Sequence, residues 1–284
     1  MSNFAKNKTN NLTLTMYRGF NLSLRKNQFE LGYFKHLQEI GSKSILLPKK
    51  TIKEKINSFV SVHGYLDGSK MQANWFPQVK ADVFISHSHK DEKLATALAG
   101  WLKTIFGLTT FIDSCVWGYS NDLLRQIDND FCINNDGQTY SYNKRNYSTS
   151  HVHMMLSVAL AQMIDNSECL FFLNTPNSIT PDSIISHTES PWIYSEITMS
   201  QLIRKKNLEE FRNQALMESR TFSDGGALKI QYNLPTEHLV DINVNDLIKW
   251  KETWKNIDSH SELPQFSNDL RVHALDKLYE IKKQ

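Results

Sequence analysis

The chain has 284 residues, of which 40% are hydrophobic, so it can bury a full core as one elaborated domain or two small ones. Its 32 Lys and Arg residues nearly balance 30 Asp and Glu residues, and a net charge of +2 excludes a general field that attracts nucleic acid or anionic membrane. No apolar run reaches bilayer-spanning length, and residues 1–11 resemble neither a signal peptide nor a membrane anchor. Three widely spaced cysteines indicate no disulfide framework, so we expect a cytoplasmic protein.

Residues 1–78 are expected to form a small N-terminal extension that is partly disordered and then mainly helical. Residues 1–14 contain nothing that would offset the entropy of ordering them. Apolar residues recur at intervals of two to three over residues 27–40, which predicts a helix ending at Gly41. Residues 49–56 are a candidate second arm of a helical hairpin. Glycines and a proline then indicate a loop, which places a domain boundary near residue 78.

Residues 79–284 are predicted to form an α/β domain, beginning with a strand, a loop and a helix. Residues 81–86 are a β-branched and aromatic run, which is typical of a strand. A helical pattern of apolar residues then continues to Gly107, and Ser88 and Asp91 have the spacing of a capping box.

A second strand is predicted at residues 109–112, and Asp113 closes it. Residues 114–121 form a polar, glycine-containing loop that opens a short helix. Residues 130–150 have no apolar periodicity, so we expect a surface insertion there and another near residues 207–226.

The remaining segments continue the alternation of helices and strands. A helix at residues 152–164 leads to a third strand at residues 168–173, which is apolar enough to lie at the sheet centre. Pro191 suits the first turn of the next helix. The tail is expected to add a strand and two helices, at residues 227–234, 244–254 and 270–281. This order predicts a flavodoxin-like, doubly wound parallel sheet with helices on both faces.

Ligands of such a sheet bind beyond the carboxyl ends of its strands. Three polar segments are expected to converge there, at residues 86–91, 113–121 and 190–196. Trp192 and Glu196 stand four residues apart, so on a helix they share one face. The sequence therefore predicts an aromatic platform beside a carboxylate.

Several of these segments resemble the Toll/interleukin-1 receptor (TIR) domain. Asp82-Val-Phe-Ile-Ser86, with the acidic helix start after it, is similar to the opening strand of TIR domains. Ser190-Pro-Trp192-Ile-Tyr-Ser-Glu196 resembles the Trp-x-x-x-Glu segment of NAD-hydrolysing TIR domains, in which the glutamate is catalytic. Phe111-Ile-Asp113 and the loop containing Gly118 resemble the second strand and the mobile loop beside the TIR pocket. The resemblance covers residues 80–204; the long insertion and a second loop without a Pro-Gly pair depart from it.

The resemblance implies a bacterial anti-phage protein that cleaves the nicotinamide–ribose bond of NAD, releasing nicotinamide and an ADP-ribose product. In NAD the nicotinamide is bound as a cationic pyridinium, so it can leave without protonation. One carboxylate that stabilises the developing ribosyl cation then suffices, and Glu196 is the predicted catalytic residue. NAD is the substrate, and no separate cofactor is expected. The predicted NAD-binding residues are Phe84, Ser86, His87, Lys90, Asp113, Trp117, Gly118 and Trp192.

Other interpretations stay open. The chief alternative is a non-catalytic TIR module that binds other proteins, with Glu196 structural. The resemblance to TIR domains implies a homo-oligomer formed through TIR–TIR contacts, and an effector or sensor protein as a further partner. A phosphate-accepting receiver domain requires an acidic pair after the first strand, but Ser86 and His87 stand there, which argues against it. A nucleoside deoxyribosyltransferase is a further alternative. The histidine pair at positions 151 and 153 lacks a third ligand at recognisable spacing, as does the pair at positions 87 and 89, so no metal site is predicted.

Overall fold

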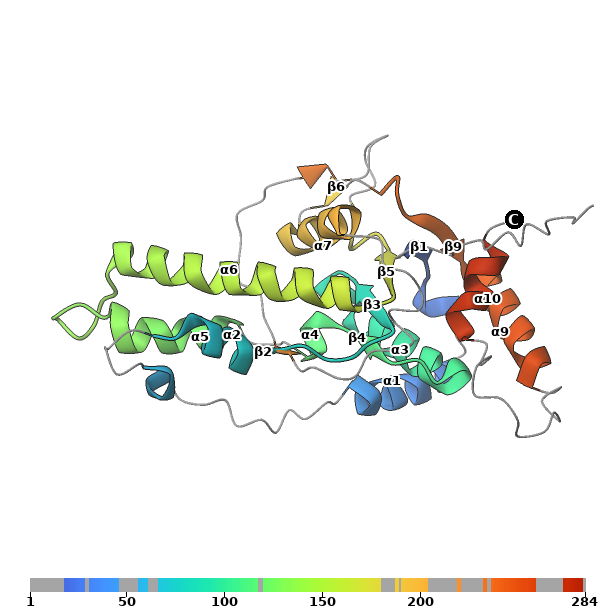
Figure 1. The fold of residues 1–284 in the computed structure, drawn as a ribbon, viewed down its shortest axis with the longest axis horizontal. Coiled ribbons are helices and arrows are strands. Elements are labelled where there is room, and N and C mark those ends of the chain that lie inside the picture. The colour runs from blue at the N-terminus through green and yellow to red at the C-terminus, as the bar shows by residue number, and fades with distance from the viewer. Residues whose placement is uncertain are drawn as a thin grey trace, which may run out of the picture.

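A computed structural model describes the central sheet, the helices around it and several connecting segments (Figure 1). The described residues are 18–28, 31–45, 56–60, 66–116, 120–179, 187–188, 190–203, 219–220, 232–233, 236–258 and 273–282. Trp117, Gly118, most of the expected insertion at residues 207–226 and most of the expected strand at residues 227–234 lie outside them.

Five parallel strands form the central sheet in the order β4-β3-β5-β1-β9. In chain order they are β1 (Arg18–Ser23), β3 (Val83–Ser86), β4 (Thr110–Phe111), β5 (Cys169–Asn174) and β9 (Val240–Asn243). The expected α/β class with a parallel sheet is confirmed, and β5 lies at the centre as its continuous apolar sequence predicted.

Helices cover both faces of the sheet. The first face carries α1 (Leu31–Ile45), α3 (Glu92–Phe106), α9 (Val244–Asp258) and α10 (Ala274–Ile281). The second face carries α2 (Gly68–Trp75), α5 (Ser120–Ile127), α6 (Tyr142–Asn166) and α7 (Pro191–Leu202). Short elements complete the described chain: η1 (Lys26–Gln28), η2 (Ile56–Phe59), η3 (His89–Asp91), α4 (Asp113–Val116), η4 (Asp128–Cys132), and the strand pairs β2 (Phe76–Pro77) with β7 (Ser219–Arg220) and β6 (His187–Thr188) with β8 (Tyr232–Asn233).

Strict alternation along the strands supplies the two cores. Val83 and Ile85 of β3 face the α1 and α3 side, whereas Phe84 between them faces the α6 and α7 side. In β5, Phe171 and Phe172 are divided in the same way, and both are fully buried. Neighbouring residues of a strand therefore point into different environments, and Ser86 follows Phe84 toward α7.

The predicted N-terminal extension is wrong for residues 18–45, which belong to the sheet domain. β1 lies between β5 and β9, with Phe20 opposite Phe171 on one side and Val240 on the other. Helix α1 packs tightly on α3, and it continues past Gly41, where the sequence predicted its end, because that glycine lets the helices touch. The order β4-β3-β5 begins like the flavodoxin order 2-1-3, but the next position is filled by the first strand of the chain.

The segment 130–150 is not the irregular insertion that was expected. Residues 128–132 form a π-helical turn, and α6 begins at Tyr142, so its first third comes from sequence without apolar periodicity. The Asp128 carboxylate explains this, because it accepts hydrogen bonds from Arg145 Nε at 2.8 Å and from Ser148 Oγ at 2.7 Å. Together with α5 and α2, this end of α6 projects from the sheet (Figure 1).

Two other local predictions have different outcomes. Ser88 precedes η3, but its side chain makes no cap hydrogen bond, so the expected capping box with Asp91 is not formed. The two helices predicted for the tail are confirmed as α9 and α10.

Candidate functional site

The candidate site lies where β3, β4 and α7 meet. The chain leaves β3 toward α3 on the first face, but it leaves the neighbouring β5 toward α7 on the second face. Adjacent strands whose connections diverge in this way open a crevice at their carboxyl ends, which is the usual ligand position of open α/β sheets.

Helix α7 brings Glu196 to this edge. The helix begins as predicted: Ser190 is its N-cap, the Ser190 Oγ accepts a hydrogen bond from the Ile193 backbone N–H at 3.2 Å, and Pro191 fills the first turn. Ile193 and Ile197 pack into the core against the sheet. Glu196 lies between them in sequence on the inward side, and its residue is only 2% exposed.

The surroundings of Glu196 disfavour a negative charge. Burial raises the pKa of its carboxyl group well above the ordinary 4.5, the negative charge of Asp113 raises it further, and the Ser86 hydroxyl opposes both effects. Within the described chain, neither Asp113 nor Glu196 forms an ion pair with a lysine or arginine. Two carboxyl groups without such a counterion make the site favourable for a cationic ligand.

His87 and Ser86 line the same place at the end of β3. The His87 side chain is 1% exposed; its Nδ1 lies 3.7 Å from Asp113 Oδ1, and its Nε2 lies 3.1 Å from Ser114 Oγ. The distance to Asp113 is too long for a hydrogen bond, and the approach of Ser86 to Glu196 also lacks hydrogen-bond geometry. His87 Nδ1 and Ser86 Oγ are thus buried polar atoms that find no partner among the described residues. Such atoms destabilise a fold unless something satisfies them, and they suit the hydroxyl groups of a ligand.

Trp192 occupies the neighbouring turn of α7, as the four-residue spacing predicted. It is half-buried against the second core, and its ring meets His153 of α6 edge to face, with centroids 5.7 Å apart. Burial lowers the pKa of His153, so burial favours the neutral ring. This contact was not predicted, because no local pattern links His153 to a residue in a helix almost forty positions away.

The other predicted residues are distributed differently. Phe84 is fully buried and packs on Phe111 with centroids 5.3 Å apart, so its side chain belongs to the core and has no surface left for a ligand. Lys90 lies in η3 with an exposed side chain. The neighbouring Asp91 accepts hydrogen bonds from Thr175 Oγ1 and Asn177 Nδ2, which ties the loop after β3 to the loop after β5. This bridge was not predicted, because it joins segments more than eighty residues apart.

Some kinds of site are missing from the described residues. They contain no group of three or more His, Cys, Asp or Glu side chains that could hold a metal ion. None of the helices described is both long and apolar enough to span a membrane. Cys132 and Cys169 are buried free thiols.

Comparison with protein-family models, with curated proteins and with solved structures finds no match to this chain. The interpretation of the site therefore rests on its own residues. Ser86, His87, Asp113 and Glu196, which were predicted to lie together, do so, and Trp192 is one helical turn away. The cluster offers two carboxyl groups, an imidazole and a hydroxyl to a ligand that carries positive charge and hydroxyl groups.

Proposed function

We propose that the protein is a TIR-type enzyme that cleaves the bond between nicotinamide and ribose in NAD. The observation that carries the proposal is the burial of the Glu196 carboxyl group beside Asp113 at the carboxyl edge of the sheet. Two carboxyl groups at a protected site favour a ligand with a positive charge, and the nicotinamide ring of NAD is a pyridinium cation. The resemblance of the Trp192 to Glu196 segment to NAD-hydrolysing TIR domains supports the same conclusion.

The reaction needs little help from the protein beyond charge stabilisation. When the glycosidic bond breaks, its electron pair stays on the nicotinamide nitrogen, and the ring leaves as a neutral molecule. Positive charge moves to the anomeric carbon of the ribose, where the Glu196 carboxylate stabilises it. A water molecule or another nucleophile then bonds to that carbon and loses a proton, which gives ADP-ribose or a cyclic or linked product.

The raised pKa of Glu196 fits this role because it makes ionisation depend on the ligand. Before binding, burial and the charge of Asp113 favour the protonated form of the carboxyl group. A cation bound beside it opposes both effects and lowers the pKa, so binding favours the carboxylate. The strongest attraction is then expressed in the transition state, where the positive charge has moved to the anomeric carbon.

Neighbouring residues supply the rest of the site. Ser86 Oγ and His87 Nδ1 are proposed to bind ribose hydroxyl groups, which would satisfy both buried atoms. Trp192 forms the wall beside the nicotinamide, and its orientation is fixed by the edge contact with His153. Lys90, which lies in η3 before the start of α3, is proposed to bind a phosphate group. In the cell we propose a cytoplasmic role in defence against phage.

The test is to incubate the purified protein with NAD and to separate the products by chromatography. We expect free nicotinamide, together with ADP-ribose or a cyclic isomer. Glu196→Gln keeps the shape of the side chain but removes its charge, and we expect kcat to fall by at least about 100-fold. The matched control is Glu252→Gln, which removes an exposed carboxyl group from α9 on the other face. Unchanged turnover in Glu196→Gln would refute the catalytic role of Glu196. If the wild-type protein neither binds nor cleaves NAD, the enzymatic proposal is refuted and the non-catalytic protein-binding module is the remaining interpretation.

A further inference from the structure

Helix α6 has an exposed face that carries no charged residues over much of its length. From residue 146 to residue 164, it contains no Asp, Glu, Lys or Arg, although 22% of the chain is charged. One side of this stretch is buried in the core through residues such as Val152, Leu156 and Met163. The other side is exposed, and an exposed helix face is normally charged or strongly polar.

The exposed side holds large side chains in a regular row. Tyr147 is 70% exposed, Met154 is 63% exposed and Val158 is 41% exposed, and His151 between them is also exposed. We call these four residues the α6 seam. Their spacing of four, three and four residues is that of a helix that packs lengthwise on another helix. The seam lies directly opposite the buried side, because Val152 and Leu156 fall half a turn away.

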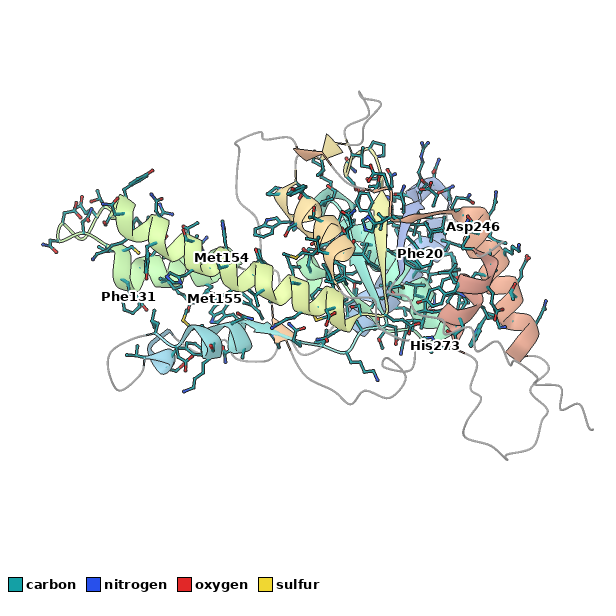
Figure 2. The ribbon with its side chains drawn as sticks, turned by 45° about the horizontal axis from the view of Figure 1, so that its top comes forward. Phe20, Phe131, Met154, Met155, Asp246 and His273 are labelled. Carbon is teal, nitrogen blue, oxygen red and sulfur yellow. The ribbon has the colours of Figure 1, made fainter. Side chains whose placement is uncertain are left out.

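Two details make the seam a good packing surface. Tyr147 and His151 contact each other edge to face with centroids 4.4 Å apart, so the rings are ordered before any partner arrives. Small side chains flank the row at Ser150, Ser157 and Ala161, which leaves room for the large side chains of a facing helix. Figure 2 shows Met154 and Met155 on the projecting part of α6; Met155 lies near Gly68 of α2 and is not part of the seam.

We propose that the α6 seam binds the seam of a second copy of the chain, with the two helices antiparallel. The spacing of the four residues is symmetric about the midpoint between His151 and Met154. A twofold axis at that midpoint therefore places Tyr147 of one copy opposite Val158 of the other. Charge favours the same direction, because Lys144 precedes the uncharged stretch and Asp165 follows it. Antiparallel helices bring these opposite charges toward each other, whereas parallel helices would align like charges.

The size of the surface predicts a reversible dimer. A helix of 25 residues is about 37 Å long, and a strip about 10 Å wide along it presents roughly 400 Å². A stable interface usually covers about 800 Å² on each partner. We therefore expect association that depends on concentration.

Sedimentation velocity of the full chain over a wide concentration range tests the proposal independently of any enzymatic activity. The wild type is expected to shift from monomer to dimer. Met154→Glu puts two like charges beside the twofold axis, and we expect the dimer dissociation constant to rise by at least about tenfold. Met154→Lys should behave likewise, and mixing the two variants should restore the dimer, which also shows that both are folded.

Leu202→Glu is the matched control, because Leu202 of α7 is 77% exposed but lies outside the seam. It should leave the association unchanged. A monomeric wild type at all concentrations, an undisturbed Met154→Glu dimer, or failure of the mixed variants to associate would each overturn the proposal.

Discussion

The buried carboxyl group of Glu196 should make the stability of the protein depend on pH in a defined direction. Its pKa is raised in the folded protein by burial and by Asp113, so between the unfolded and the folded pKa only the unfolded chain releases the proton. Unfolding then becomes easier as pH rises. The stabilising effect is complete below the unfolded pKa, and it is lost as pH rises through the folded pKa.

Glu196→Gln isolates this effect, because glutamine has the same shape and does not titrate. At low pH both side chains are neutral, and we expect similar free energies of unfolding. Above pH ~4.5 the difference in favour of the variant should grow by about 1.4 kcal/mol per pH unit until the folded pKa is reached. Urea denaturation followed by tryptophan fluorescence at a series of pH values measures it. The reasoning would be refuted if the difference in free energy of unfolding between the variant and the wild type stayed constant with pH. It would also be refuted if the variant lost stability relative to the wild type as pH rises.

Two further predictions concern the packing around the sheet. A Cβ atom on Gly100 would lie 1.9 Å from the Leu37 carbonyl oxygen, about 1.5 Å short of an ordinary 3.4 Å contact, so Gly100→Ala should force α1 from α3 and lower the free energy of unfolding by about 3 kcal/mol. Gly68→Ala, with its nearest neighbour at 3.7 Å, should change it by less than about 0.5 kcal/mol, and equal effects in a denaturation experiment would contradict the close helix contact. Tyr279→Phe removes the hydroxyl that donates to Glu168 Oε1 at 3.0 Å and should lower the free energy of unfolding by about 1 to 3 kcal/mol; an unchanged denaturation midpoint would show that this hydrogen bond contributes nothing.

The order of elements from β3 to α7 was predictable because each leaves a local pattern. Short apolar runs predicted β3 and β5, and Ser190 followed by Pro191 predicted the start of α7. The site followed from topology, since residues that directly follow parallel strands meet at one edge of the sheet. The sequence alone therefore predicts that Ser86, His87 and Asp113 lie near one another.

The place of β1 was not predictable in the same way. Phe20 and Leu22 alternate with polar residues, but only over a short segment, and nothing local says that this strand pairs with β5 and β9. Strand order depends on partners that are far apart in sequence. The start of α6 was missed for a related reason, because it is held by Asp128 through Arg145 and Ser148 instead of by an apolar stripe.

The two buried glutamates that flank β5 show why burial alone does not identify a functional residue. Glu168, just before the strand, is 2% exposed, but Tyr279 donates a hydrogen bond to it at 3.0 Å and His273 Nδ1 lies 3.9 Å away. That carboxyl group fastens α10 to the sheet. Glu196 is equally buried at the opposite end, yet no described side chain donates a hydrogen bond of ordinary geometry to it, and its nearest charge is another carboxylate.

A carboxyl group that ionises in such surroundings destabilises the fold, whereas an apolar residue there would not. Ser86 Oγ and His87 Nδ1, which find no hydrogen-bond partner in the described part of the chain, destabilise the same place further. Polar groups that weaken the fold at the ligand edge of a sheet are explained when a bound molecule satisfies them, and a cation with ribose hydroxyl groups would satisfy all three. The difference between Glu168 and Glu196 therefore lies in their partners, and it is this difference that makes Glu196 the candidate for catalysis.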